Sequence, residues 1–274
     1  MSRVKSTLRK VAPWPLLYAY LKLRDLPQDL PQIARLLFQA TKTPTRFVQR
    51  IRLVWQCYRI SYLVECAHKE NEMIEVMRAI FALDPSVRGV VVEAGSYKGG
   101  SGVKLSLAAR LANRTLYLFD SFEGIPRHAE VHIMNIHGSE ALFPPGSYQG
   151  SLQEVRHAIT AYGAIETCKF VKGWFQDTMP HFKEPVAVAY IDVDLRSSTS
   201  TCMQYLYPRL IEDGVLFSQD GHLPLVIDLL QDDSFWNNTV KSPVPTMRGL
   251  GRRKLVEIRK PTQERGRESA ACVN

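Results

Sequence analysis

Residues 89–126 constrain the fold of this chain more than any other stretch. They read GVVVEAGSYKGGSGVKLSLAARLANRTLYLFDSFEGIP. An apolar segment at 90–93 is followed by a glycine turn and a segment rich in Leu and Ala, and a second apolar segment at 116–119 ends on Asp120. A strand, a glycine turn, a helix, a second strand and a terminal acid together predict the nucleotide-binding half of an α/β fold.

The rest of the chain continues this alternation. We expect further strands at 168–171, 186–191, 214–218 and 254–258, and helices at 61–83, 151–162, 198–210 and 223–230. Alternating apolar strands and helices predict a mostly parallel central sheet with helices on both faces. Ligands bind such sheets at the carboxyl ends of the strands. Acids and glycines gather at these predicted ends: Glu93, Gly95, Asp120, Gly173, Asp192, Asp194 and Asp220.

Charge divides the chain into an arm, a body and a tail. Residues 1–60 contain 12 Lys and Arg against 2 acids, whereas residues 61–247 contain 15 against 22. We therefore predict a basic helical arm over 1–60, one α/β domain over 61–260 and a disordered tail over 261–274. Because the body is acidic, no nucleic-acid partner is expected at its site.

Cysteine usage and hydropathy suggest a location. The five cysteines are an odd number and form no CxxC motif, which favours a reducing compartment. No apolar run is long enough to span a bilayer, and the amino terminus lacks a small-x-small cleavage site. We expect a cytoplasmic protein.

Two segments outside the alternating pattern have open roles. In the arm, apolar residues recur at helical spacing among Arg and Lys, which is compatible with a peripheral membrane contact. The alternative is a lid or dimerisation arm with a solvated basic face, and the prolines favour it because they break a long amphipathic surface. The segment 126–150 is long and polar and shows no helical or strand periodicity, as expected of a functional loop.

The glycine-turn unit predicts a binding site for a nucleoside. Asp120 lies 25 residues after Gly95, where a carboxylate can accept both ribose hydroxyls. Glu93 directly precedes the turn and is expected to repel a phosphate. A positively charged nucleoside such as S-adenosylmethionine fits better. The alternative is a generic strand–helix–strand unit with surface acids.

The ends of the strands expected at 186–191 and 214–218 predict a metal site and a catalytic base. Asp192 and Asp220 end consecutive strands, which lie about 4.8 Å apart when they are neighbours in a sheet. The two carboxylates form a candidate site for Mg²⁺ or a similar ion, which prefers oxygen ligands. Asp194 or His222 is a candidate base for a substrate hydroxyl. The alternative is that these acids only contact the nucleoside.

Several motifs resemble one family. The segments EAGSYKGGS, FDSFEGIP, GSYQGSLQEV, VKGWFQDTMP and YIDVDLRSST are similar to the macrocin O-methyltransferase (TylF/MycF-type) family. The resemblance covers about residues 60–225 and implies a Rossmann-like class I fold with dependence on S-adenosylmethionine and Mg²⁺. It also implies methylation of sugar or related hydroxyls in natural products, and an arm that serves as lid and oligomerisation segment, hence a homo-oligomer.

The resemblance also assigns roles to residues. It implies that Gly95, Asp120 and Ser121 hold the cofactor, with Asp177 on the adenine side. Glu93, Ser101 and Gly173, in the same motifs, complete the candidate cofactor set. It further implies that Asp192 is a metal ligand and that Asp194 lies beside the acceptor.

One position departs from the family pattern. Members of the family usually have two adjacent acids after the last core strand. In this chain the two positions hold Gln219 and Asp220. A glutamine supplies an oxygen without charge, so metal binding should weaken unless His222 compensates.

We therefore expect an S-adenosylmethionine-dependent O-methyltransferase acting on a small-molecule hydroxyl. One alternative is a non-catalytic, membrane-associated nucleoside-binding protein. The other is a nicotinamide-dependent oxidoreductase, which the missing GxGxxG motif disfavours.

Overall fold

The computed structural model describes residues 14–260, so the predicted tail lies outside the described residues. Within them, seven strands form one sheet in the order β3-β2-β1-β4-β5-β7-β6. The strands are β1 Val90–Ala94, β2 Leu116–Asp120, β3 Cys168–Lys172, β4 Val186–Ile191, β5 Leu210–Ser218, β6 Thr246–Arg248 and β7 Val256–Arg259. Strands β1 to β5 are parallel, and β7 pairs antiparallel with β5 and β6. The predicted mostly parallel sheet is confirmed, although β6 was not expected.

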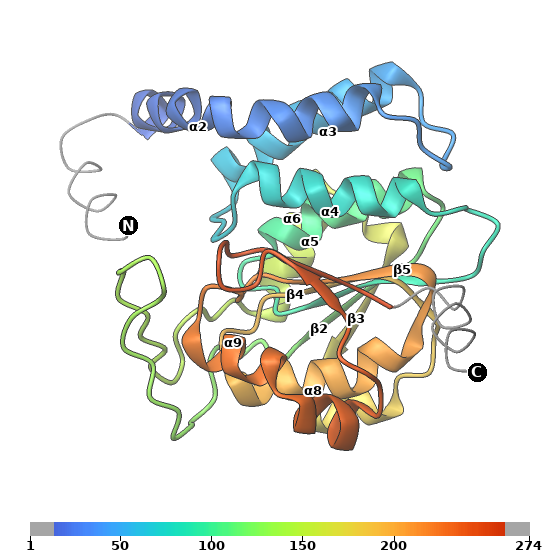
Figure 1. Cartoon of the computed structure of the whole chain (residues 1–274). Helices are drawn as coiled ribbons and strands as arrows, with labels where there is room; N and C mark the ends of the chain where they lie inside the picture. Colours follow the sequence, from blue (N-terminus) through green and yellow to red (C-terminus); the bar gives the residue numbers. More distant parts are fainter. Residues whose placement is uncertain (1–13, 261–274) are drawn as a thin grey trace.

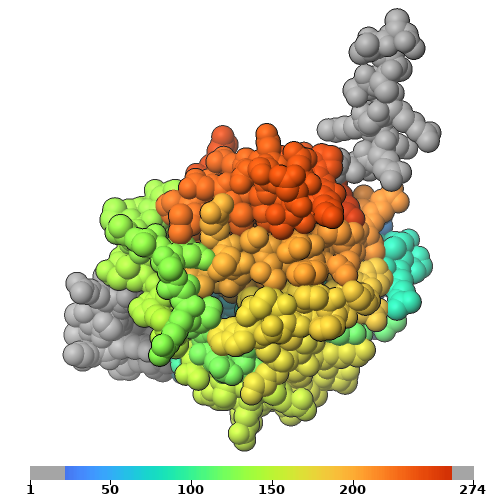
Figure 2. Space-filling view, turned by 90° about the horizontal axis from the view of Figure 1, so that it is seen from below, coloured from blue at the N-terminus to red at the C-terminus, as the bar shows by residue number. Residues whose placement is uncertain are grey.

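Helices cover both faces of this sheet (Figure 1). The α-helices are α2 Trp14–Phe38, α3 Phe47–Leu63, α4 Glu70–Ala82, α5 Gly100–Leu111, α6 Leu152–Tyr162, α7 Phe175–Thr178, α8 Arg196–Leu206 and α9 Pro224–Gln231. Short 3-10 helices span Ile165–Thr167, Met179–His181 and Tyr207–Arg209, and a π-helix spans Phe235–Val240. Helices α4, α5 and α6 lie on one face, with α2 and α3 outside them. Figure 2 shows the opposite face, where α8 and α9 lie.

Burial on both faces explains why the central strands are apolar runs. Every residue of β4 is buried, because this strand lies between β1 and β5 and under helices on each side. Two apolar clusters result, one on each face of the sheet. The cluster under α4 and α5 also contains Leu36, Leu53 and Ile60 of the arm. The arm therefore shares its core with the sheet.

Helix α2 corrects our expectation that prolines interrupt the arm. It runs unbroken from Trp14 to Phe38 with Pro27 and Pro31 inside it. A proline leaves the carbonyl four residues earlier without its helical partner. Both prolines are exposed, and they are four residues apart, so they lie on one face of the helix. Water can hydrate the carbonyls that they leave unpaired, and the helix continues.

The single helix expected over residues 61–83 is wrong. Helix α3 ends at Leu63, and α4 begins at Glu70. The connecting segment packs tightly on the start of α5, since a Cβ on Gly100 would lie 2.3 Å from Cys66 Sγ. The carboxylate of Glu72 then accepts a hydrogen bond from the Lys69 backbone N–H at 2.8 Å and caps α4.

A buried charged cluster fastens the arm to α5. Lys104 of α5 is fully buried and donates to Ser61 Oγ at 2.7 Å. Its Nζ also lies 2.8 Å from His68 Nε2. Burial, and next the Lys104 ammonium, hold the pKa of His68 well below its ordinary value, so the neutral imidazole can accept from Lys104. The predicted boundary at residue 60 falls inside α3 and stays a prediction. Among the described helices, none combines the length and apolarity needed to cross a bilayer.

Candidate active site

A cavity of about 810 Å³ lies at the carboxyl edge of the parallel strands. The residues that follow β1 to β5 line it, as the strand ends predict. Segments that do not belong to the sheet close it: part of α2, residues 65–72, the loop between β2 and α6, and residues 252–255. The cavity is thus formed jointly by the sheet edge, the arm and the long polar loop.

The glycine turn after β1 must contain glycine at its first position. Gly95 has φ +86°, and a Cβ there would lie 1.9 Å from the carbonyl oxygen of Asp192. Gly99, with φ +85°, precedes α5 as its N-cap. The backbone of the turn therefore passes directly over the end of β4, which brings the first strand end and the acid segment together.

Asp120 orders the turn from the next strand. Its Oδ2 accepts from the Ser96 N–H and its Oδ1 from the Phe122 N–H, both at 2.6 Å. Burial raises its pKa, and these backbone hydrogen bonds oppose that change. Each carboxylate oxygen keeps a lone pair for a ligand. Of the predicted cofactor residues, five line the cavity: Gly95, Ser101, Asp120, Ser121 and Gly173.

Glu93 and Asp177 are not among the cavity-lining residues. Glu93 is completely buried behind the turn, where its Oε2 accepts from Ser96 Oγ at 3.1 Å. Burial raises its pKa to about 8, so the carboxyl is protonated near neutral pH. The expected repulsion of a phosphate by Glu93 is therefore wrong, because a protonated carboxyl carries no charge. Asp177 is exposed on α7, next to the cavity-lining Gln176.

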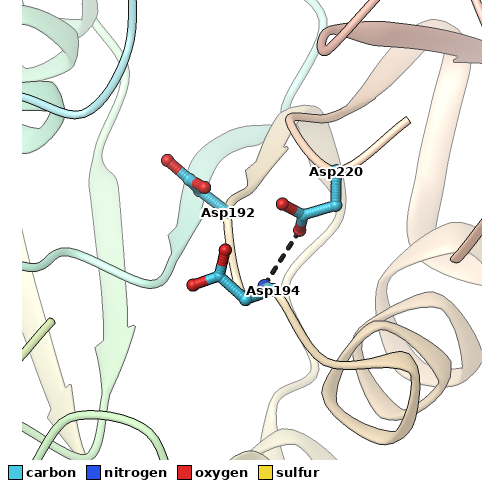
Figure 3. A group of neighbouring side chains, drawn as sticks. All are labelled: Asp192, Asp194 and Asp220. Atoms are coloured by element: carbon cyan, nitrogen blue, oxygen red, sulfur yellow. Dashed lines mark hydrogen bonds between the residues drawn. The ribbon is translucent and has the colours of Figure 1, made fainter. Parts of the chain in front are cut away.

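Three aspartates converge at the ends of β4 and β5 (Figure 3). Asp192, Asp194 and Asp220 each offer an oxygen, and these atoms lie within 4.8 Å of one another. Asp220 Oδ2 accepts from the backbone N–H groups of Val193 at 3.1 Å and Asp194 at 3.0 Å. The Tyr190 hydroxyl donates to Asp192 Oδ2 at 3.1 Å. The predicted adjacency of these strand ends is confirmed.

The cluster concentrates negative charge in a desolvated place. Burial raises the pKa of Asp192 to about 6 and that of Asp220 to about 7, and it raises that of Asp194 well above its ordinary value. The neighbouring carboxylates raise the pKa of Asp194 and Asp220 further. The Lys254 ammonium lowers the pKa of all three aspartates and so opposes these changes. The arrangement therefore favours a cation.

The other two predicted residues of this region also line the cavity. Gln219 is buried; its Nε2 donates to Glu72 Oε2 at 2.7 Å, and its Oε1 has no protein partner among the described residues. His222 is buried and its ring stacks on His137 at 6.2 Å between centroids. Burial, then the charges of Lys254 and His137, lower the pKa of His222 to about 4.

Sequence reasoning missed Glu72, Lys254 and the way the long loop is held. The carboxylate of Glu130 in this loop accepts from the backbone N–H groups of Arg196 at 2.8 Å and Ser197 at 2.9 Å, at the start of α8. The Ile136 N–H donates to the carbonyl of His222 at 3.0 Å. No local pattern signals such contacts, because each joins residues that are far apart in the chain.

Comparison with known proteins identifies the family of this chain. The model of the macrocin-O-methyltransferase (TylF) family matches residues 61–244. The chain belongs to this family. The predicted family is confirmed, and the match contains the glycine turn, the long loop and the acid cluster.

Two curated relatives of this chain are O-methyltransferases named for the natural products on which they act. The 8-demethyl-8-(2,3-dimethoxy-alpha-L-rhamnosyl)-tetracenomycin-C 4'-O-methyltransferase of Streptomyces olivaceus is 31% identical over 160 residues, which are 55% of this chain and 59% of that protein. The mycinamicin III 3''-O-methyltransferase of Micromonospora griseorubida is 32% identical over 154 residues, which are 52% and 59% respectively. The matched part thus spans about three fifths of each curated relative.

Solved structures confirm the fold of this chain. The O-methyltransferase NovP superposes with a TM-score of 0.62 at 22% identity, over 78% of this chain and 100% of that one. The calicheamicin methyltransferase CalS11 superposes with a TM-score of 0.56 at 16% identity, over 86% and 93%. The predicted class I methyltransferase fold is therefore confirmed.

Proposed function

We propose that this chain is an S-adenosylmethionine-dependent O-methyltransferase that acts on a hydroxyl of a sugar-containing natural product. The observation that carries the proposal is that the glycine turn with Asp120 and the aspartate cluster line the same cavity. Donor and acceptor would therefore meet in one enclosed space. Family membership and the names of the curated relatives support the sugar hydroxyl as acceptor.

On the donor side, the chain supplies shape and hydrogen bonds. The absence of a side chain at Gly95 leaves room for a ligand to approach the backbone of the turn. Asp120, held by two backbone amides, presents its remaining lone pairs to ribose hydroxyls. Ser101, Ser121 and Gly173 complete this wall of the cavity.

On the acceptor side, Asp194 is the proposed base. It would take the proton of the acceptor hydroxyl while that oxygen gains the methyl group and the sulfonium becomes a thioether. Asp194 has a carboxylate oxygen within 4.8 Å of those of Asp192 and Asp220, which would hold the cation, and a bound cation would favour the ionised form of Asp194, which can take a proton. The pKa of His222 is lowered to about 4, which makes it a weak base. Of the two candidates left open by the sequence, Asp194 is therefore preferred, and His222 is assigned to positioning.

The aspartate cluster fits a divalent cation. All its donors are oxygens, as Mg²⁺ prefers, and Gln219 Oε1 is a buried oxygen without a hydrogen bond to the described residues. Asp192, Gln219 and Asp220 would hold the ion. When bound, such an ion lowers the pKa of a hydroxyl that it contacts. Both a cytoplasmic location and self-association through the arm remain predictions.

Calorimetry of the full chain tests the proposal most directly. We expect binding of S-adenosylmethionine and none of NADH, with and without Mg²⁺. A mass-spectrometric screen of glycosylated natural products then reports a gain of one methyl group. Failure to bind S-adenosylmethionine would refute the methyltransferase assignment, and binding of NADH would favour the oxidoreductase. Donor binding without transfer to any hydroxyl would favour a non-catalytic protein.

A Gln219→Glu variant should bind a divalent cation at least about tenfold more tightly than the natural chain, because a charged ligand replaces a neutral one. Titration with Mn²⁺, followed by electron paramagnetic resonance, measures this without any turnover. Gln153→Glu, the same change at an exposed position of α6, should leave the affinity unchanged. Equal affinity in all three proteins, or undiminished affinity after Asp220→Asn, would remove the metal from the proposal.

A further inference from the structure

The outer face of α2 and α3 is unusually apolar for an exposed surface. These helices form the outermost layer on one side of the molecule (Figure 1). Their exposed large apolar side chains include Leu23 (69%), Leu30 (52%), Phe38 (75%), Phe47 (48%), Val48 (72%), Ile51 (45%) and Trp55 (59%). On α3, Val48, Ile51 and Trp55 recur three and four residues apart and so share one face. Apolar residues gathered in this way indicate an interaction surface rather than scattered exposure.

The charged residues exposed among these apolar ones are all basic. Over residues 22–63, the exposed charged side chains are Arg24, Arg35, Lys42, Arg46, Arg52 and Arg59. The same range contains two acids. Asp29 is buried and accepts from the Tyr58 hydroxyl at 2.7 Å, and Asp25 is paired with Arg24. Lys42 is also paired with Asp213 of the body. The surface therefore combines apolar and aromatic side chains with a net positive charge, which comes mainly from Arg35, Arg46, Arg52 and Arg59.

The unbroken course of α2 gives this surface its extent. The prolines were the reason to favour a merely solvated arm, and Pro27 and Pro31 do not interrupt the helix. Two long helices therefore present apolar and basic side chains on the outside of the protein. The inner sides of the same helices, with Leu36, Leu53 and Ile60, pack on the core. This division is that of a helix lying in a membrane interface.

We propose that the outer face of α2 and α3 binds the surface of a membrane that contains anionic lipid. Arg52 and Arg59 would contact phosphate headgroups, while Val48 and Trp55 would enter the boundary between headgroups and acyl chains. A two-fold contact that places this outer face against the same face of a second copy is disfavoured, because it would oppose two basic surfaces; the predicted self-association would then use another part of the arm. The proposal does not depend on methyl transfer, so either can fail alone.

Sedimentation of the full chain with vesicles tests the proposal. We expect binding to phosphatidylcholine vesicles that contain phosphatidylglycerol, weak binding to phosphatidylcholine alone, and loss of binding as salt is raised. Each basic residue near such a surface contributes about fivefold to the partition coefficient. Arg52→Glu with Arg59→Glu should therefore lower it at least about 25-fold. Val48→Ser with Trp55→Ser should lower it about tenfold or more.

Matched controls are Lys183→Glu and Val244→Ser, both at exposed positions outside the arm; they should bind as the natural chain does. Point variants are preferable to removal of the arm, which would strip apolar residues from the core. Thermal unfolding checks that each variant is folded. Equal sedimentation with both kinds of vesicle, or equal loss in the controls, would overturn the proposal. So would a dimer in analytical ultracentrifugation that the Val48→Ser, Trp55→Ser variant dissociates, because the face would then be a self-interface.

Discussion

A Gly95→Ala variant should lose measurable binding of S-adenosylmethionine. The added Cβ would lie 1.9 Å from the carbonyl oxygen of Asp192, and φ of +86° is itself unfavourable for alanine. Neither atom belongs to a flexible side chain, so the turn must move away from the end of β4. We expect affinity to fall at least about 100-fold and the melting temperature to fall, as for other substitutions at special backbone positions. Calorimetry and thermal unfolding measure both.

Gly138→Ala provides the matched control for the backbone conformation. Gly138 also has a positive φ, +72°, but nothing lies within 4 Å of a Cβ built there. This variant carries the conformational cost of alanine without the collision, and it should bind S-adenosylmethionine normally. If both variants bind equally well, the close approach of the turn to β4 does not shape the donor site.

Asp194→Asn should lower kcat by about 10² to 10⁴ with little change in the affinity for S-adenosylmethionine. A positioned general base contributes a factor of this size, and asparagine has the same shape but takes no proton. The backbone conformation is tolerated, because Asp194 has φ +61° and asparagine enters the left-handed region readily. Single-turnover kinetics with saturating donor isolate the chemical step, and calorimetry reports donor affinity.

The control for this variant is Asp213→Asn. Asp213 has the same φ of +61° but is exposed and pairs with Lys42 away from the cavity. Its replacement should leave kcat unchanged. A fully active Asp194→Asn enzyme would show that another group takes the proton, and His222 would then be the next candidate. A variant that loses donor binding as well would instead place Asp194 in the donor site.

The site was predictable where it follows from strand order. Once apolar segments alternate with helices, their carboxyl ends meet at one edge, and the sequence alone brings Asp120, Asp192 and Asp220 together. The motif YIDVD marks the acid cluster, and FDSFEGIP marks the turn after β2. These predictions needed no knowledge of side-chain contacts, because the topology of a parallel sheet imposes them.

Other features depend on contacts that no local pattern records. Glu93 looks like a charged ligand in the sequence, yet burial keeps it neutral behind the turn. Gln219 looks like a plain ligand, but its amide donates to Glu72, which is 147 residues away in the chain. The apolar periodicity continues through residues 61–83 and so predicts one helix. The break between α3 and α4 instead follows from the packing of the connecting segment on α5. In each case tertiary contacts, and not the local sequence, determined the charge, the hydrogen bonding or the helix boundary.

The fastening of the long loop has a consequence for how acceptor range can change. Glu130 attaches the loop to the start of α8, and Ile136 attaches it to His222, while its intervening residues form neither helix nor regular strand. Beyond the second attachment point, residues 139–143 line the cavity, and substitutions there can reshape its wall without displacing the aspartates at the strand ends. In an evolutionary lineage, or in directed evolution, the loop is the part that can diversify while the aspartates keep their positions at the strand ends.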